Sequence, residues 1–131
     1  MKGKFLANYV GPAIASVLIS GIVHARQFVC TPGVVYSFES DGKLRVAEDP
    51  GRSRKVFTVD TSTGLLQGDQ VLPLGSYTVV YAGTATDGAK LIRNDAARLE
   101  VLFVATNATS PHPFMFTDGV TTITGTCRPS S

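Results

Sequence analysis

The 131-residue sequence contains no tryptophan and only two cysteines and two histidines. Two cysteines without a histidine cluster cannot build an ordinary structural zinc site, which takes four ligands. So few histidines also leave the usual acid–base and nucleophilic mechanisms without their partner groups. The sequence shows no glycine-rich phosphate loop, metal-ligand spacing or nucleophile elbow. We therefore expect no cofactor, no metal and no catalytic residue of a recognisable kind.

The first 25 residues have the order of a secretory signal peptide. Lys2 and Lys4 precede an apolar run from Val10 to Val23, and the segment closes on the small residue Ala25. A membrane span would need about 20 mostly apolar residues, and this run is shorter. A buried helix is the other alternative, but Pro12 and two glycines make it a poor one. We predict cleavage after Ala25, a secreted protein, and no membrane attachment of the mature chain.

Cleavage would leave residues 26–131, which is the size of a single domain. The full chain has 12 Lys+Arg and 10 Asp+Glu, and Lys2 and Lys4 would leave with the signal peptide. The mature domain would then carry ten charges of each sign. Such a neutral balance argues against nucleic acid as a general partner, because nonspecific affinity for phosphate depends on basic contacts.

Cys30 and Cys127 form an even pair in a chain predicted to be secreted, which indicates a disulfide. They lie 97 residues apart. In the chain-entropy model, closing a loop of that size stabilises a fold by roughly 4–5 kcal/mol. The alternative, two free thiols, is unfavourable outside the cytosol. We expect this bond to tie the amino and carboxyl ends of the domain together.

Short β-branched and aromatic runs separated by turn residues predict an all-β fold. Four hairpins are predicted: residues 34–38 with 43–46, 55–60 with 65–67, 90–93 with 98–106, and 114–117 with 121–124. A helix is the alternative for the third, whose turn we place at Asn94-Asp95. Residues 76–81 form the strongest strand, which we expect to be central. The sum is an antiparallel β-sandwich or small barrel of about seven to nine strands.

Two loops are the candidate partner-binding regions. The first, residues 48–54, contains Arg52 and Arg54, which form a basic cluster with Lys55. The second, residues 106–113, contains His112, the sole histidine of the mature chain. A solvated loop is the structural alternative for the cluster, and a surface loop the alternative to catalysis for His112. The aspartates sit mostly beside glycine or in turns, where they bond their own backbone. We expect residues 128–131 to be a frayed tail.

Asn107-Ala108-Thr109 is an N-glycosylation sequon in a predicted loop of a secreted chain. In a eukaryotic host this sequon is a candidate for glycosylation. A glycan at Asn107 would keep this end of the domain solvated and free of partner contact.

Phe28-Val29-Cys30, just after the predicted cleavage site, resembles the aromatic-x-Cys motif at the mature start of mildew-type effectors, small secreted proteins of plant-pathogenic fungi. In their ribonuclease-like members a second cysteine near the carboxyl end closes the pair, as Cys127 could here. The chain lacks a clear helix and the histidines of an active ribonuclease. The short β-sandwich effectors of blast-type fungi share the layout, with a cysteine pair that usually spans fewer residues. The resemblance implies binding to a host protein without catalysis.

We therefore expect a secreted, non-catalytic module that binds a protein partner, with a virulence effector acting inside or at the surface of a host cell as the specific form. An extracellular hydrolase with a carboxylate site is one alternative, since such a site needs two carboxylates on facing walls of a cleft. A structural wall or coat protein is the other.

Overall fold

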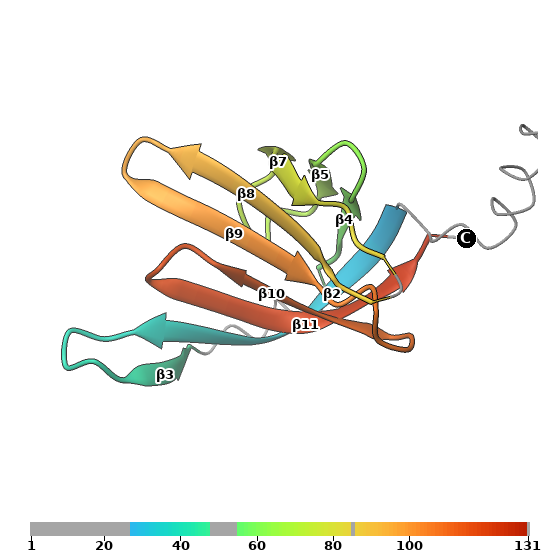
Figure 1. The fold of residues 1–131 in the computed structure, drawn as a ribbon. Helices are drawn as coiled ribbons and strands as arrows, with labels where there is room; N and C mark the ends of the chain where they lie inside the picture. Colours follow the sequence, from blue (N-terminus) through green and yellow to red (C-terminus); the bar gives the residue numbers. More distant parts are fainter. Residues whose placement is uncertain (1–26, 48–54, 85, 131) are drawn as a thin grey trace, which may run out of the picture.

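One antiparallel sheet curls almost into a barrel in the computed structural model, which describes residues 27–47, 55–84 and 86–130 (Figure 1). Its ten strands are β2 (Gln27–Phe38), β3 (Leu44–Ala47), β4 (Phe57–Asp60), β5 (Leu65–Gly68), β6 (Gly75–Ser76), β7 (Thr78–Tyr81), β8 (Ala89–Asp95), β9 (Arg98–Val104), β10 (His112–Thr117) and β11 (Thr121–Pro129). The described residues contain no helix. The predicted all-β, antiparallel architecture is confirmed, and of the two alternatives it is the barrel-like one.

The order of strands around the sheet follows the order of the chain. Nine strands run β6-β5-β4-β2-β11-β10-β9-β8-β7, while β3 branches off β2. The two end strands, β6 and β7, are separated in sequence by Tyr77 alone. The backbone N–H of Tyr77 donates to the carbonyl of Gly64, 2.8 Å away, just before β5. The two ends of the sheet therefore have to meet, which is why the sheet curls instead of spreading.

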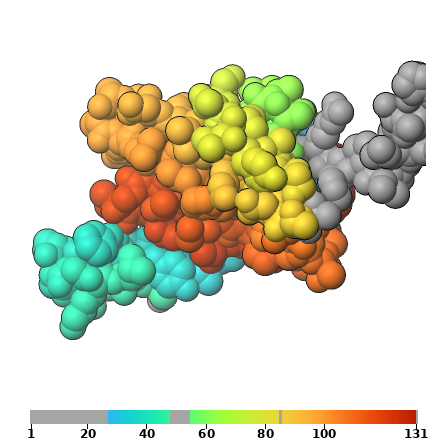
Figure 2. Space-filling view, viewed as in Figure 1, coloured from blue at the N-terminus to red at the C-terminus, as the bar shows by residue number. Residues whose placement is uncertain are grey.

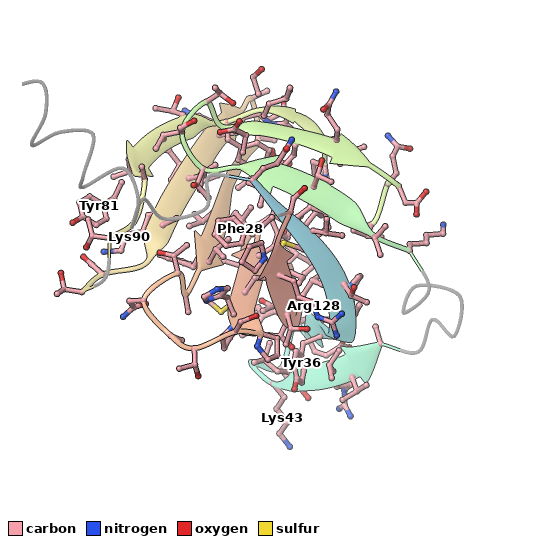
Figure 3. The ribbon with its side chains drawn as sticks, turned by 90° about the vertical axis from the view of Figure 1, so that its right-hand side faces the viewer. Phe28, Tyr36, Lys43, Tyr81, Lys90 and Arg128 are labelled. Carbon is pink, nitrogen blue, oxygen red and sulfur yellow. A yellow bond between two sulfur atoms is a disulfide. The ribbon has the colours of Figure 1, made fainter. Side chains whose placement is uncertain are left out.

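Alternating side chains fill the interior. In β9, Leu102 and Val104 are buried, whereas Phe103 between them faces outward. The same period of two sends one apolar set from every long strand inward. The core consists of Phe28, Cys30, Val35, Phe57, Val59, Leu66, Val71, Leu72, Tyr77, Ala89, Leu91, Leu102, Val104, Phe114, Phe116, Ile123 and Cys127. Phe28 lies inside the ring of strands in Figure 3.

All four predicted hairpins form, and the hairpin interpretation of residues 90–103 is confirmed over the helix. In this third hairpin the strands extend to Asp95 and Arg98, which pair with each other. The turn therefore falls at Ala96-Ala97, two residues later than predicted, with Ala96 at φ 44°. The register that buries Leu91 against Leu102 fixes this position, so burial outweighs the turn preference of Asn94-Asp95.

The expectation of one central strand over residues 76–81 is wrong. The segment splits into β6 and β7, and β7 ends the path of the sheet. Val80 is 56% exposed and Tyr81 37% exposed. The physical reason lies at Tyr77, which turns inward between the two strands and donates its hydroxyl to the carbonyl of Pro73 at 2.7 Å. The high content of β-branched residues thus predicted a strand correctly, but it did not predict where in the sheet that strand lies.

The two ends of the domain are joined by a bond and by strand pairing. Cys30 and Cys127 are directly opposite each other on β2 and β11 and form the predicted disulfide. The expected frayed tail is wrong for Arg128 and Pro129, which pair with Val29 and Phe28. The backbone N–H of Ser130 then donates to the carbonyl of Gln27. The carboxyl end is therefore ordered because it closes the sheet.

The predicted signal peptide and its cleavage after Ala25 lie outside the described residues, as does the loop 48–54. Among the residues that are described, none belongs to a helix of the length and apolarity needed to cross a bilayer.

Candidate protein-binding surface

The hairpin of residues 35–47, called here the arm, projects from the body of the domain. The first residues of β2 pair with β4, whereas its last four, Val35 to Phe38, pair with β3. The same part of β2 also pairs with β11, so β3 is an additional edge strand beside β2. Figure 2 shows the arm as a separate lobe at one end of the molecule, and Figure 1 shows β3 at its outer margin.

The outer face of the arm is apolar. Cross-strand pairing joins Tyr36 to Val46 and Phe38 to Leu44, so these four side chains share one face. Phe38 is 51% exposed, Leu44 59% and Val46 62%. Val35, one residue from Tyr36, is buried, which places Tyr36 and Phe38 on the face turned away from the core.

This face continues onto the neighbouring turn. Val120, between β10 and β11, is 58% exposed, and its carbonyl accepts a 2.7 Å hydrogen bond from the backbone N–H of Phe38. Most outward positions of a half-buried antiparallel sheet are polar. A contiguous apolar face on the solvent side therefore marks an interaction surface more than a packing surface.

The opposite face of the arm packs on the core at its base, through Val35 and Ala47, and is charged toward its tip. Arg45 lies 3.4 Å from a carboxylate oxygen of Asp41 and 3.9 Å from one of Glu39. Lys43 makes no ion pair with any described residue, and Figure 3 shows it extending away from the body. These charges are exposed, so they contribute little to stability. Arg45 is paired within the arm, so Lys43 is the cation that remains for a partner approaching along β3.

β3 pairs only with β2 among the described residues. Its other edge thus presents backbone N–H and carbonyl groups that no described strand satisfies. Such an edge is a template for strand addition by another chain. The arm therefore combines two independent features of a binding surface, an open backbone edge and an exposed apolar face.

The basic cluster predicted from sequence is only partly described. Arg52 and Arg54 lie outside the described residues, while Lys55 is exposed and comes two residues before β4. In the sequence, these residues follow within eight positions of Ala47, the end of β3. The chain therefore leads directly from the arm into the cluster.

His112 does not lie in a loop, contrary to expectation. It begins β10 opposite Cys127 and is partly buried. Its Nδ1 is 3.1 Å from the carbonyl oxygen of Ala105, and its ring meets that of Phe28 edge-on at 5.5 Å between centroids. These contacts tie His112 to the fold. Among the described residues, no hydrogen bond, ion pair or ring contact joins it to Lys55.

The aspartates behave as the turn interpretation predicts. Asp60 accepts from the backbone N–H groups of Ser62 and Thr63, and Asp118 accepts from those of Val120 and Thr121. The hydrogen bond from the Ser62 hydroxyl is the main cause that lowers the pKa of Asp60. Asp41 and Asp87 also accept hydrogen bonds from backbone N–H groups in their own turns, whereas Asp69 accepts one from Val56, 13 residues away in the sequence. Asp49 lies outside the described residues.

One buried carboxylate stands apart from the turns. Glu100 is 2% exposed and accepts a 2.7 Å hydrogen bond from Nε of Arg93. Nη1 of Arg93 donates to the carbonyl of Leu74 at 2.7 Å, and the guanidinium lies 4.8 Å from the centre of the Tyr77 ring. Burial, followed by the charge of Glu100, raises the pKa of Tyr77 far above its usual range. The cluster fastens the closing segment to β8 and β9.

The described residues contain no group of three His, Cys, Asp or Glu side chains able to hold a metal ion. The hydrogen bond to Glu100 raises the pKa of Arg93, so the guanidinium stays charged, and its Nε and Nη1 both donate within the fold. The Arg93–Glu100 pair therefore has a structural role, in which it holds the closing segment at Leu74 against β8 and β9. It is not a pair of carboxylates on facing walls of a cleft.

Sequence reasoning located the arm as a hairpin and placed Leu44 and Val46 on one face, but it did not identify that face as exposed. Alternation within a hairpin says which residues share a face and not which face meets the core. No short-range signal in the sequence gives this, because exposure here follows from β3 pairing only with β2 among the described strands, while that part of β2 also pairs with β11.

The aromatic-x-Cys residues are core positions in this fold. Phe28 is 2% exposed and Cys30 fully buried. No protein-family model, curated protein or solved structure matches the chain.

Proposed function

We propose that the protein is a secreted, non-catalytic module that binds a protein partner through the arm. The observation that carries this proposal is the apolar outer face of the arm, where Phe38, Leu44 and Val46 are each more than half exposed. Exposed apolar area of this kind lowers solubility unless a partner covers it. Because this loss of solubility is unfavourable for an isolated domain, we expect the apolar face of the arm to have a function.

The arm favours an extended segment of the partner, added as a strand to the free edge of β3. Main-chain hydrogen bonds would supply affinity, and alternate side chains would supply specificity. On β3, Leu44 and Val46 face one way and Arg45 faces the other, and Lys43 directly precedes the strand. The complementary strand therefore alternates apolar and acidic residues. Arg52 and Arg54, close to β3 in sequence, add to the preference for acidic residues.

A second copy of this chain fits the edge less well. Antiparallel pairing of two β3 strands would bring Lys43 and Arg45 of one copy toward the same residues of the other. Like charges on facing strands are destabilising. A different, acidic chain removes this repulsion, so we propose a partner other than the protein itself.

The proposal extends to a host protein as the partner, in the manner of a virulence effector. Its support is the signal-like leader and the resemblance of Phe28-Val29-Cys30 to the start of fungal effectors. Both are features of the sequence alone.

Titration with labelled eight-residue peptides tests the binding mode. The probes are an alternating Val/Glu peptide, an alternating Val/Lys peptide and an alternating Ser/Glu peptide. We expect the Val/Glu peptide to bind at least tenfold more tightly than the other two, and the double variant Leu44→Ser, Val46→Ser to lose that preference. Val80→Ser is the matched control, because Val80 is 56% exposed on β7, away from the arm. Equal affinity for all three peptides would overturn the strand-addition mode.

Parallel affinity capture tests the function itself. The wild-type protein, the Leu44→Ser, Val46→Ser variant and the Val80→Ser variant are each used on extracts of host tissue and of the producing organism. A protein retained by the wild type and by Val80→Ser, and lost with the arm variant, supports the proposal. Retention of a glycan, self-assembly, or capture that survives the arm substitutions would count against it and favour the hydrolase or the structural protein.

A further inference from the structure

A second apolar surface lies on the outside of the barrel, away from the arm. It is a shallow hollow of about 320 Å³ over β8, β9 and β10. Strand register places Lys90 beside Phe103 and Phe103 beside Met115, all facing outward. Phe103, Pro113 and Met115 give the hollow its apolar floor, and Met115 is 38% exposed.

The two charged side chains at this hollow, Lys90 and Asp87, neutralise each other. Nζ of Lys90 lies 3.4 Å from a carboxylate oxygen of Asp87 and 5.7 Å from the centre of the Tyr81 ring. Figure 3 shows Tyr81 and Lys90 together on the outer surface. A ligand here would gain little from its own charge. The hollow therefore favours a neutral occupant with an apolar side.

Asn107 forms part of the wall of this hollow. It is exposed, in the turn between β9 and β10 that is closed by a 3.0 Å hydrogen bond from the N–H of Ala108 to the carbonyl of Ala105. A Cβ placed on Gly88 would lie 3.4 Å from Oδ1 of Asn107, so the carboxamide rests against the start of β8. Asn107 is also the first residue of the sequon Asn107-Ala108-Thr109.

We propose that Asn107 carries an N-linked glycan whose first N-acetylglucosamine lies in the hollow and stabilises the domain. That sugar is neutral, and its C–H face and acetyl methyl group are apolar. It can cover Phe103 and Met115 in the way aromatic and thioether groups are covered in protein contacts. The sequence alone suggested a glycan standing free in solvent. The hollow beside Asn107 assigns the first sugar a place on the protein.

The modification is a group transfer from a lipid-pyrophosphate-linked oligosaccharide, supplied by the secretory pathway of a eukaryotic cell. Nδ2 of Asn107 forms a bond to C1 of the first sugar, while the bond from C1 to the pyrophosphate oxygen breaks. The carboxamide loses one proton to a base of the transferase, and the lipid pyrophosphate leaves with the electron pair. Thr109 completes the sequon that the transferase recognises.

The test uses the full chain with its own leader, secreted from eukaryotic cells, with thermal unfolding as the readout. One enzyme trims the glycan to its first sugar, and Thr109→Ala, which destroys the sequon and keeps Asn107, supplies the sugar-free form, because enzymatic release of the whole glycan would convert Asn107 to aspartate. We expect the trimmed form to keep a melting temperature about 3–6 °C above the sugar-free form, as a gain near 1 kcal/mol would give in a domain of this size.

Two variants of the floor decide whether the hollow is responsible. In Met115→Ser, and independently in Phe103→Thr, the difference between trimmed and sugar-free forms should fall to less than half. Leu99→Ser is the matched control, because Leu99 is 55% exposed on β9 outside the hollow and should leave the difference unchanged. An unmodified Asn107 in the secreted protein, an absent difference, or one that persists in both floor variants would overturn the proposal. None of these readouts depends on a protein partner, so they are independent of the function proposed for the arm.

Discussion

Nε of Arg93 donates to Oε1 of Glu100 across the β8–β9 hairpin at 2.7 Å, and this pair fixes the closure of the sheet. Glu100 is 2% exposed and the Arg93 side chain 26%. The same guanidinium reaches the carbonyl of Leu74, in the segment that brings β6 and β7 together. The β8–β9 hairpin is thus tied to the segment where the two ends of the sheet meet.

Replacing one member of this pair should be costly. Arg93→Met leaves the Glu100 carboxylate buried without its partner, and we expect a loss of about 3–5 kcal/mol in the free energy of unfolding. The double variant Arg93→Met, Glu100→Leu should recover a large part of that loss, because no buried charge remains. Urea unfolding of the wild type, Arg93→Met, Glu100→Leu and the double variant gives the coupling free energy of the two side chains. Additive losses in the double variant would show that the two side chains are not coupled.

The disulfide should contribute a large share of the net stability. The bond between Cys30 and Cys127 closes a loop with a sequence separation of 97, which corresponds to roughly 4–5 kcal/mol in the chain-entropy model. The variant Cys30→Ala, Cys127→Ala should therefore unfold at much lower urea concentration. The wild-type protein should take up no alkylating reagent before reduction. Two alkylated sulfhydryls in the unreduced protein would contradict the bond.

Stability should fall in acid partly through Asp118. Burial by itself would raise the pKa of Asp118, but hydrogen bonds from the backbone of Thr121 and Val120 and the charge of Arg98 outweigh it and lower the pKa. A carboxyl whose pKa is lower in the folded state adds stability above its unfolded pKa, near 3.8. That stability is lost as the pH falls through the lower, folded value.

Asp118→Asn keeps an oxygen that can accept the backbone bonds and removes the charge. At neutral pH we expect it to be less stable than the wild type by about 1–2 kcal/mol. The gap should close as the pH falls below about 4. Urea unfolding at a series of pH values measures it. A gap that is constant from neutral pH into strong acid would show that the charge of Asp118 contributes nothing.

Gly64 should be intolerant of any side chain. Its φ is +85°, and a Cβ there would collide with the backbone carbonyl oxygen of Tyr77. Gly64→Ala should therefore cost at least about 2–3 kcal/mol, more than backbone strain alone. Gly42→Ala is the matched control, because Gly42 has the same φ of +85° and nothing within 4 Å. Thermal unfolding of both separates collision from strain, and equal losses would mean that the closure at Tyr77 is not tight.

The predicted leader is tested by the mass of the exported protein. Secreted material should begin at Arg26, as expected from the small residue Ala25 at the end of the apolar run. Amino-terminal sequencing or intact mass after removal of any glycan measures this. An intact Met1 terminus in secreted material would contradict the signal-peptide interpretation.

Much of the fold was predictable because hairpins are local. Asp41-Gly42 and Asp118-Gly119 mark turns, and each is flanked by strands that pair as expected. The failures came where distant contacts decide. The turn at Ala96-Ala97 follows from burial of Leu91 against Leu102, and the split at Tyr77 follows from closure of the sheet. Neither contact leaves a signature in a short window of sequence.

The sequence by itself determined the strands, their turns and the pairing of two cysteines, because each depends on residue type and on neighbours in the chain. Only the tertiary structure decided which faces are covered. Leu44 and Leu102 are the same residue type in similar alternating runs, yet one is 59% exposed on the arm and the other fully buried. The difference is that β9 is paired on both sides within the barrel, whereas β3 is an edge strand with one described partner. Burial is set by what lies opposite a strand, and that is a property of the whole fold.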